Sequence, residues 1–340
     1  MRAGVFLAYW PWFTPAEQVD LAVLADHLGL DSAWVAEAWG QDAVSVLGLL
    51  AGKTDRIGLG SGLMQIPARK PTATAMAAAS LDVLSAGRFR LGLGLSGPQV
   101  SEGWYGVPFT RNLARTREYV DVVRRTLARE RIQLPLEGGA DGSGLGKALK
   151  LLTRPVQDPL PIYLGAIGPR AVRQAGALAD GWLPFMLDPV EPEVLLGPLR
   201  EGAEEAGRSL ADIDIAPVVP VAVDEDLGAA RDAVRPWLAF YFGAMGAKDK
   251  NFYVELAERQ GHGEAARDVQ ARGLAGDRLG AVQAVTDGLV DAGAIATTPA
   301  GLDERLAAYE RAGVTTLVAV PCGDDKPGVL RALAAATVTR

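Results

Sequence analysis

The sequence predicts an α/β fold, a (β/α)8 TIM barrel with insertions, in a single domain that spans residues 1–340. Eight short, strongly apolar runs alternate with amphipathic helical segments along a chain whose composition is 49% hydrophobic. Several helices also run into the next strand through a glycine-bearing joint, as at Gly29, Gly181 and Gly313. Eight βα units with such strands favour a closed parallel barrel. A doubly wound open sheet is the alternative.

The alternation sets the order of the expected elements. Helices are expected to begin near residues 15, 42, 72, 111, 169, 191, 226 and 326. The expected strands are residues 3–9, 32–36, 57–62, 89–94, 162–165, 181–183, 213–223 and 315–321.

Two stretches do not fit simple βα units. Residues 131–150 are rich in glycine and are expected to form an excursion or hairpin after the fourth helix. Residues 224–299 read as a mainly helical insertion before the last strand, too long for a connection in a compact barrel. Because loops at the carboxyl ends of barrel strands build the active site, we expect this insertion to cover the pocket mouth or to form a subunit contact. An insertion that serves packing alone is the alternative.

Composition excludes several classes of function. The net charge is −7, and no run of Lys or Arg exceeds two residues, which argues against nucleic acid or anionic membrane as a partner. The amino-terminal residues read as a first strand and not as a signal peptide, and no apolar stretch approaches the ~20 residues that span a bilayer. One cysteine, Cys322, excludes an internal disulfide, and His27 and His262 cannot make a histidine-rich metal site. We therefore expect a cytoplasmic protein with a small-molecule substrate, no metal, and chemistry carried by something other than its side chains.

Small residues end three of the expected strands. The third ends in Gly60-Ser61-Gly62, the fourth in Gly94-Leu95-Ser96-Gly97, and the fifth runs into Gly165-Ala166-Ile167-Gly168-Pro169. Such strand ends suit a flat ligand that lies against backbone, and Pro169 marks a helix start that favours an anion, usually a phosphate. None of the three is a GxGxxG fingerprint. Tight turns and packing are the alternative explanation for these glycines.

Five segments in this order resemble the luciferase-like flavin and deazaflavin oxidoreductases, and more narrowly their coenzyme F420-dependent branch. The resemblance covers nearly the whole chain, to AGVTTLVAVP at residues 312–321. It implies the barrel fold and, at the end of the third strand, a cis peptide between Gly62 and Leu63 behind the deazaflavin ring. The segments are AWVAEAW (33–39), RIGLGSGLMQIPARKP (56–71), LDVLSAGRFRLGLGLSGPQ (81–99), LARTREYVDVVRRTL (113–127) and PIYLGAIGPRAVRQAGALADGWLP (161–184).

The same resemblance implies where the cofactor binds. Its phosphate is expected on the loop after the fifth strand, and its ring and ribityl chain beside the loops after the third and fourth. The cofactor-binding residues that it implies are Glu37, Gly62, Leu63, Gln65, Ser96, Gly97, Pro98, Gln99, Gly165, Ala166, Ile167, Gly168, Pro169 and Arg170. Arg69 and Lys70 follow the third strand and could meet carboxylates of the cofactor's glutamyl tail, with solvated charge as the default.

The second strand departs from the family pattern. Many F420 enzymes of the family place an acid followed by histidine at its end, whereas this chain has Glu37-Ala38. Glu37 could bind a ring carbonyl if protonated, donate a proton to the substrate or orient Trp39; pairing with an arginine is the alternative. We therefore name Glu37 and Tyr9 as candidate catalytic residues. The candidate substrate contacts are Trp10, Trp39, Trp104 and Phe185.

The sequence thus predicts an F420-dependent oxidoreductase that transfers hydride between the deazaflavin C5 and a small organic substrate. Reduction of an activated C=C, C=N or C=O bond is the favoured direction. An FMN-dependent luciferase-like monooxygenase is the first alternative, and a non-catalytic flavin- or deazaflavin-binding protein is an alternative of another class. A homodimer is expected.

Overall fold

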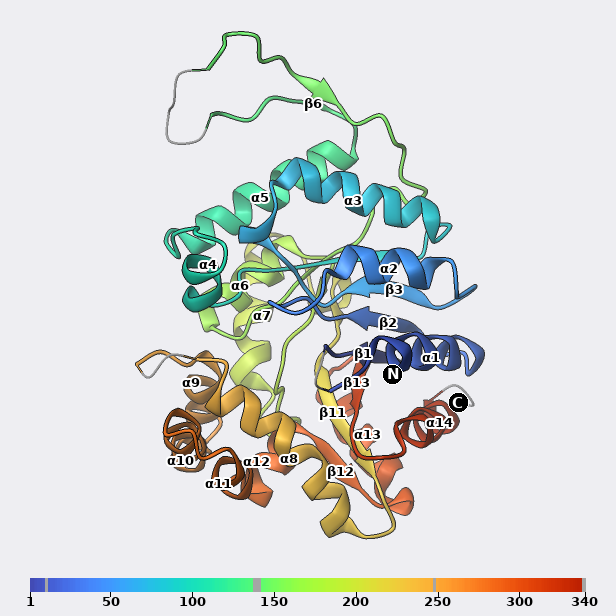
Figure 1. Ribbon diagram of the computed structural model, residues 1–340, viewed down its shortest axis with the longest axis vertical. Coiled ribbons are helices and arrows are strands. Elements are labelled where there is room, and N and C mark those ends of the chain that lie inside the picture. Colours follow the sequence, from blue (N-terminus) through green and yellow to red (C-terminus); the bar gives the residue numbers. More distant parts are fainter. Residues whose placement is uncertain (10–11, 137–141, 247–248, 338–340) are drawn as a thin grey trace.

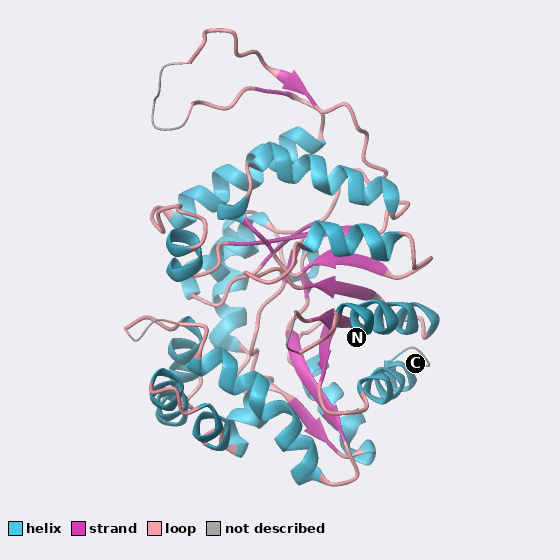
Figure 2. Cartoon of the chain, viewed as in Figure 1, coloured by secondary structure: helices cyan, strands magenta, loops and turns pink. Residues whose placement is uncertain are grey.

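Parallel strands form the inner layer of the protein and helices surround them (Figures 1 and 2). The computed structural model describes residues 1–9, 12–136, 142–246 and 249–337. The architecture is the (β/α)8 barrel that the sequence predicts. Its strands, in barrel order, are β1 (Arg2–Leu7), β2 (Ser32–Val35), β3 (Gly58–Ser61), β5 (Phe89–Gly94), β8 (Ile162–Leu164), β9 (Gly181–Trp182), β10 (Asp214–Ile215) continued by β11 (Val218–Val223), and β13 (Thr316–Pro321).

The sheet closes at its seventh position, where the expected strand 213–223 is interrupted. The first part, β10, pairs with β9 in the register Asp214↔Gly181, and the second part, β11, pairs with β13 in the register Val218↔Val318. Pro217 lies at the interruption and has no N–H to donate, but its carbonyl accepts a hydrogen bond from the Val318 N–H at 3.0 Å. Closure excludes the doubly wound alternative. A short strand, β4 (Met64–Gln65), also pairs with β5.

The helices begin within two residues of the predicted positions. In α1 the Thr14 side chain accepts from the Glu17 N–H at 3.2 Å while the Glu17 carboxylate accepts from the Thr14 N–H at 2.8 Å, which makes a capping box. The predicted helices are α1 (Pro15–His27), α2 (Ala43–Ala51), α3 (Pro71–Leu84), α5 (Asn112–Leu127), α6 (Pro169–Leu178), α7 (Glu193–Glu205), α8 (Leu227–Gly243) and α14 (Lys326–Thr337). Between them lie α4 (Pro98–Gly103), α13 (Leu302–Arg311) and the 3-10 turns η1 (Ile66–Ala68), η3 (Leu210–Asp212) and η4 (Pro299–Gly301).

The described residues of the glycine-rich stretch 131–150 leave the barrel as an arm. Its ends are β6 (Arg131–Ile132) and β7 (Leu149–Lys150), which pair antiparallel. In Figure 1 the arm extends beyond α3 and α5, away from the rest of the molecule.

The stretch 224–299 holds helices and one strand that was not among those expected. After α8 come α9 (Phe252–Arg259), α10 (Gly263–Leu274), α11 (Arg278–Gln283) and α12 (Asp287–Gly293). The additional strand, β12 (Ile295–Thr297), lies parallel to the end of β11 in the register Val223↔Thr297. Three residues are too few for hydrophobic periodicity to distinguish a strand from a loop.

Several of the glycines at the strand ends make room for large interior side chains. A Cβ on Gly60 would lie 2.2 Å from the Trp34 ring, and one on Gly181 would lie 2.1 Å from the Tyr163 ring. At Gly165 it would lie 2.1 Å from the Leu63 side chain. Contacts this short are forbidden in a close-packed interior. Packing, the alternative given above for the strand-end glycines, therefore accounts for Gly60 and Gly165, and packing also accounts for Gly181 at the joint before β9.

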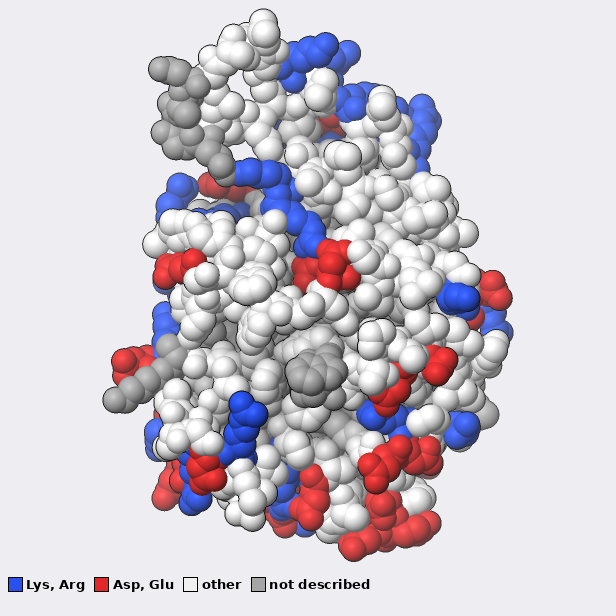
Figure 3. Space-filling view, viewed as in Figure 1, with Lys and Arg blue, Asp and Glu red and all other residues white. Residues whose placement is uncertain are grey.

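No helix in the described part of the chain is long and apolar enough to cross a membrane. On the face shown in Figure 3, acidic and basic side chains are interspersed with broad uncharged areas.

Candidate active site

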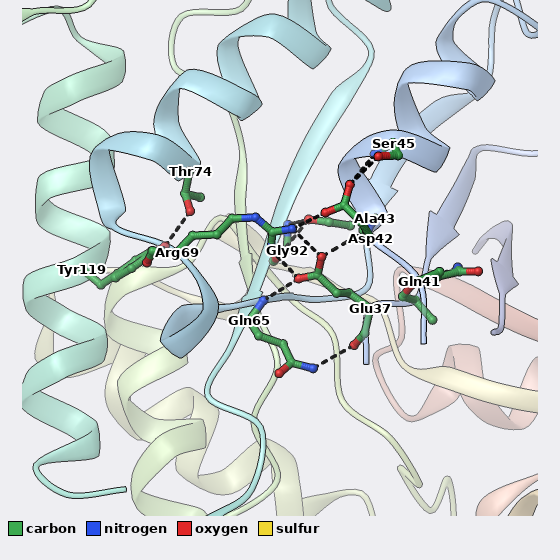
Figure 4. A network of polar contacts seen from close by, with 12 residues as sticks. Glu37, Gln41, Asp42, Ala43, Ser45, Gln65, Arg69, Thr74, Gly92 and Tyr119 are labelled. Atoms are coloured by element: carbon green, nitrogen blue, oxygen red, sulfur yellow. Dashed lines mark hydrogen bonds and ion pairs between the residues drawn. The ribbon is translucent and has the colours of Figure 1, made fainter. Parts of the chain in front are cut away.

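Glu37 lies at the centre of a buried polar network at the carboxyl end of β2 (Figure 4). Its carboxylate forms a two-pronged pair with Arg69: Oε2 accepts from Nη1 at 2.6 Å and Oε1 from Nη2 at 2.7 Å. Oε1 also accepts from the Ala43 N–H at 3.2 Å, and Oε2 from the Gln65 N–H at 3.0 Å. The side chain is 3% exposed. Four hydrogen-bond donors therefore hold the Glu37 carboxylate. Among the roles that the sequence left open for Glu37, this arrangement is the alternative of pairing with an arginine.

Arg69 connects this carboxylate to the start of α2 and to α5. Its guanidinium also pairs with Asp42, the N-cap of α2, whose side chain accepts from the Ser45 N–H at 2.8 Å. The hydrogen bonds that Arg69 donates to Glu37 raise the pKa of Arg69 further, although partial burial acts against this rise. The Arg69 carbonyl accepts from the Tyr119 hydroxyl at 3.1 Å. Arg69 is therefore engaged within the protein, not a solvated charge, and the network fixes the loop after β3 against its neighbours.

Gln65 presents an unpaired acceptor beside this network. Its Nε2 donates to the Glu37 carbonyl at 3.1 Å, and because a carbonyl can only accept, the amide nitrogen must face Glu37. The Oε1 atom therefore faces the other way, where it is buried and has no hydrogen-bond partner among the described residues. Gln65 is 6% exposed. A buried acceptor without a donor costs about 1–3 kcal/mol, so this position suits a ligand N–H or O–H.

The peptide between Gly62 and Leu63 is cis, as the family resemblance implies. The Leu63 side chain is half-buried and packs against the glycines of two neighbouring strands. Cβ atoms on Gly92, Gly94 and Gly165 would lie 2.9, 2.8 and 2.1 Å from it. The glycines on β5 and after β8 therefore leave the space that the Leu63 side chain occupies.

The loop after β5 contains the four expected residues 96–99. Ser96 takes a left-handed conformation with φ of 59°, and Gly97 is the N-cap of α4. Ser96 and Gln99 are exposed, whereas Gly97 and Pro98 are half-buried.

The loop after β8 exposes several backbone donors at the start of α6. Gly165 uses its N–H in the sheet, donating to the Leu93 carbonyl at 3.0 Å. The N–H groups of Ala166, Ile167 and Gly168 donate no hydrogen bond within the described residues. Gly168 is the N-cap, Pro169 opens the helix, and a Cβ on Gly168 would meet no atom within 4 Å. The loop is therefore open to an anion, and Arg170 beside it is exposed.

Tyr9 follows β1 and has a buried hydroxyl without a hydrogen bond among the described residues. Burial raises the pKa of Tyr9 to about 12, and the neighbouring Tyr241 hydroxyl offsets part of this rise. Tyr9 therefore stays protonated near neutral pH. Its hydroxyl is a buried proton donor whose neighbour is the Tyr241 hydroxyl.

An aromatic cluster lies near Tyr9. Phe185, after β9, packs against Tyr241 at 4.9 Å and against Phe6 at 5.8 Å between ring centroids. Tyr241 on α8 also contacts Tyr253 on α9 at 4.9 Å. The further members of the cluster are Trp12, Trp237 and Phe240.

The structure describes three of the four expected substrate contacts, and they differ in burial. Phe185 belongs to the aromatic cluster, whereas Trp39 is 48% and Trp104 64% exposed. Trp10 lies outside the described residues.

Sequence reasoning missed the residues that the insertion brings to this face. Arg259 and Gln260 at the end of α9 donate to the Ile167 carbonyl at 2.8 Å and the Met186 carbonyl at 2.9 Å. Tyr241 lies in the aromatic run 240–242 of α8, which was the available signal. Nothing local marks Arg259, because its contact partner is 92 residues away.

Comparison with known proteins assigns the family. The Luciferase-like monooxygenase family matches residues 1–316. A protein of Mycobacterium tuberculosis, provisionally named a coenzyme F420-dependent oxidoreductase, is 40% identical over 328 residues that cover 94% of each chain. A 5,10-methylenetetrahydromethanopterin reductase of Methanolobus tindarius is 30% identical over 94% of this chain and 96% of the relative. The solved structure of the coenzyme F420-dependent tetrahydromethanopterin reductase of Methanopyrus kandleri superimposes with a TM-score of 0.84, at 27% identity, over 100% of this chain and 99% of the other.

A closed parallel barrel with a buried polar network and open backbone donors at its strand ends defines an enzyme of the luciferase-like class. The chain belongs to the luciferase-like monooxygenase family, and within it the relatives just described are oxidoreductases.

Proposed function

We propose that this enzyme is a coenzyme F420-dependent oxidoreductase that transfers hydride between the deazaflavin C5 and a small organic substrate, in the reducing direction on an activated C=C, C=N or C=O bond. The relative from M. tuberculosis, 40% identical over nearly the whole chain, supports the cofactor. The observation in the structure that carries the proposal is the unpaired, buried Gln65 Oε1, on the residue two positions after the cis Gly62–Leu63 bond.

The residues present fit this cofactor at both of its ends. The pyrimidine edge of a deazaflavin carries an N–H that suits the unpaired Gln65 Oε1. The open N–H groups of Ala166 to Gly168 suit its phosphate. Bound deazaflavin supplies a two-electron hydride carrier.

The protein's own contribution is to position the ring and to deliver a proton. Glu37 holds the loop of Gln65 through Arg69, and its four donors leave its carboxylate no free site for a proton. Glu37 is therefore better suited to position the ring than to act as the acid. Tyr9 is protonated near neutral pH and makes no hydrogen bond to a charged group, so we assign it the proton donation. The aromatic cluster around Phe185 and Tyr241 provides the apolar wall for the substrate.

A binding experiment tests the cofactor. Purified protein is titrated with F420, FMN and FAD while cofactor fluorescence is followed. We expect micromolar F420 binding and no FMN binding. Preference for FMN would favour a monooxygenase instead, and binding without turnover of any enone, imine or carbonyl substrate would favour a binding protein.

Tyr9→Phe tests the assignment of Tyr9 as the proton donor. In this variant hydride transfer to the substrate should slow by about 10²- to 10⁴-fold, while the affinity for F420 stays unchanged.

We also propose that the enzyme is a homodimer that associates through the arm and α3. Met76 and Leu84 on α3 are 58% and 63% exposed, and Leu136 and Leu149 on the arm are 58% and 64% exposed. Residues of both elements line a cavity of about 900 Å³. The surface over α3 is largely uncharged in Figure 3. A two-stranded hairpin is marginal on its own, so a second copy that covers the arm would satisfy both surfaces in a two-fold arrangement.

Light scattering after size exclusion tests the dimer. The chain mass is 35.7 kDa, so a dimer is expected near twice that value, about 71 kDa. Leu84→Glu should shift the mass toward the monomer, whereas Leu279→Glu, 70% exposed on α11, should not. A wild-type protein at the monomer mass would contradict the proposal. A cytoplasmic location stays a prediction of the sequence.

A further inference from the structure

Helix α9 of the insertion lies across the carboxyl ends of the barrel strands. Two adjacent residues at its end fix it to two loops: Arg259 Nη2 donates to the Ile167 carbonyl after β8, and Gln260 Nε2 donates to the Met186 carbonyl after β9. At its start, Phe252 packs near Phe109 with 6.4 Å between ring centroids. The helix thus contacts the loops that follow three successive strands. The expectation that the insertion covers the mouth agrees with these contacts.

Arg259 is a half-buried cation without an acidic partner. Its Nη2 donates to the Ile167 carbonyl and its Nε to the Glu255 carbonyl at 3.3 Å, while Nη1 has no partner among the described residues. Arg267, also on the insertion, pairs with Glu258. Partial burial lowers the pKa of Arg259, and the nearby Glu255 only partly offsets this. A cation removed from water without a counter-ion is unfavourable, so the position calls for an anion.

This guanidinium binds the same loop after β8 that carries the free N–H groups. Arg259 donates to the Ile167 carbonyl. The N–H groups of Ala166, Ile167 and Gly168 in the same loop have no acceptor among the described residues. The open space at Gly168 admits a ligand to the start of α6. We propose that Arg259 completes the phosphate site of the deazaflavin cofactor, so that the insertion contributes a cofactor-binding residue to the barrel. The inference rests on the proposed function.

Cofactor forms that differ only in their tails test this. The dissociation constants of three forms are measured by fluorescence for the wild type, Arg259→Gln, Arg259→Lys and the control Arg267→Gln. The three are F420 with its glutamyl tail, the form without glutamates that keeps the phosphate, and the chromophore with its ribityl chain alone. For Arg259→Gln we expect the two phosphate-bearing forms to bind about 10- to 100-fold more weakly. The chromophore should bind as in the wild type, and Arg267→Gln should leave all three unchanged.

Further readouts separate the roles of Arg259. Affinity for the phosphate-bearing forms should fall with ionic strength in the wild type and less steeply in Arg259→Gln. Arg259→Lys should retain part of the affinity for the phosphate-bearing forms, because lysine keeps the positive charge but lacks the planar set of guanidinium donors. Equal weakening of all three forms would mean that Arg259 only shapes the loop, and weakening of the glutamylated form alone would place it at the tail; either result overturns the inference. Wild-type protein that binds no deazaflavin would instead refute the proposed function.

Discussion

Replacing Glu37 by glutamine should destabilise the protein and loosen the cofactor site together. The substitution removes the negative charge opposite Arg69 and puts an amide N–H₂ where one carboxylate oxygen accepted hydrogen bonds. Removing one partner of a fully buried ion pair costs about 3–5 kcal/mol. Because Arg69 is 21% exposed and retains Asp42, we expect a smaller loss of about 2–3 kcal/mol in the free energy of unfolding.

Urea unfolding followed by tryptophan fluorescence measures this loss. Glu304→Gln is the matched control, because Glu304 pairs with Arg311 but is 77% exposed, and exposed pairs contribute at most about 1 kcal/mol. The double variant Glu37→Gln/Arg69→Gln should be less destabilised than the sum of its single variants by about 1–3 kcal/mol, since neither charge is then left alone. F420 affinity should fall in Glu37→Gln, because the Gln65 loop loses its anchor.

One outcome would refute this reasoning. If Glu37→Gln unfolds at the wild-type urea concentration and binds F420 normally, yet transfers hydride to substrate more than about 100-fold more slowly, the carboxyl group is the proton donor and not an anchor.

Other contacts predict the outcomes of further substitutions. Burial raises the pKa of Tyr119 to about 12, so the unfolded state releases this proton first, near pH 10. Stability is therefore intact below pH 10 and falls above it by up to ~1.4 kcal/mol per pH unit; Tyr119→Phe should show a shallower loss in alkaline urea titrations, and an unchanged slope would contradict this. Gly92→Ala should fail to fold stably, because its Cβ would lie 1.9 Å from the Ser61 carbonyl oxygen. Gly168→Ala should have the melting temperature of the wild type, because its Cβ would meet no atom within 4 Å. Similar melting temperatures for the two variants would contradict the packing at Gly92. Burial disfavours the ionised form of Asp26, but three backbone N–H donors outweigh it and lower its pKa. Asp26→Asn should therefore cost about 2 kcal/mol at pH 7, a difference that shrinks as the pH falls below 3.8, the unfolded value; a constant difference from pH 7 to pH 2 would exclude this origin.

The barrel was predictable because its signals are local. Strands of four to six apolar residues, proline at the first helical turn and polar N-caps such as Thr14 and Asp42 act within a few positions. The interruption of the seventh strand was not predictable, since Pro217 is compatible with an edge or a bend until its neighbours are known. The strand β12 was missed because three residues carry no periodicity.

The candidate site was predictable only in part, because its contacts join distant segments. The family resemblance led to the positions of Glu37 and Gln65. It could not reveal that Arg69, 32 residues further on, saturates the Glu37 carboxylate. The glycines illustrate the opposite error: a strand end without side chains suits either a ligand or a large neighbour. Only the fold shows that Gly165 receives Leu63, while Gly168, three residues later, faces open space.

The two halves of the site are built from different parts of the chain, which bears on what can be transferred from relatives. In the function proposed above, most of the cofactor side comes from strand ends two to five, where the Glu37 network and the open loop at Gly168 are set by the barrel, and the insertion adds only Arg259. The proposed substrate side draws on α8 and α9, where Tyr241 packs against Phe185 and Tyr253 packs against Tyr241. Insertions can change without disturbing a barrel core. Two chains can therefore share the strand-end part of the cofactor side and act on different substrates, so the reductase activity named for the relatives from Methanolobus and Methanopyrus does not by itself set the substrate here.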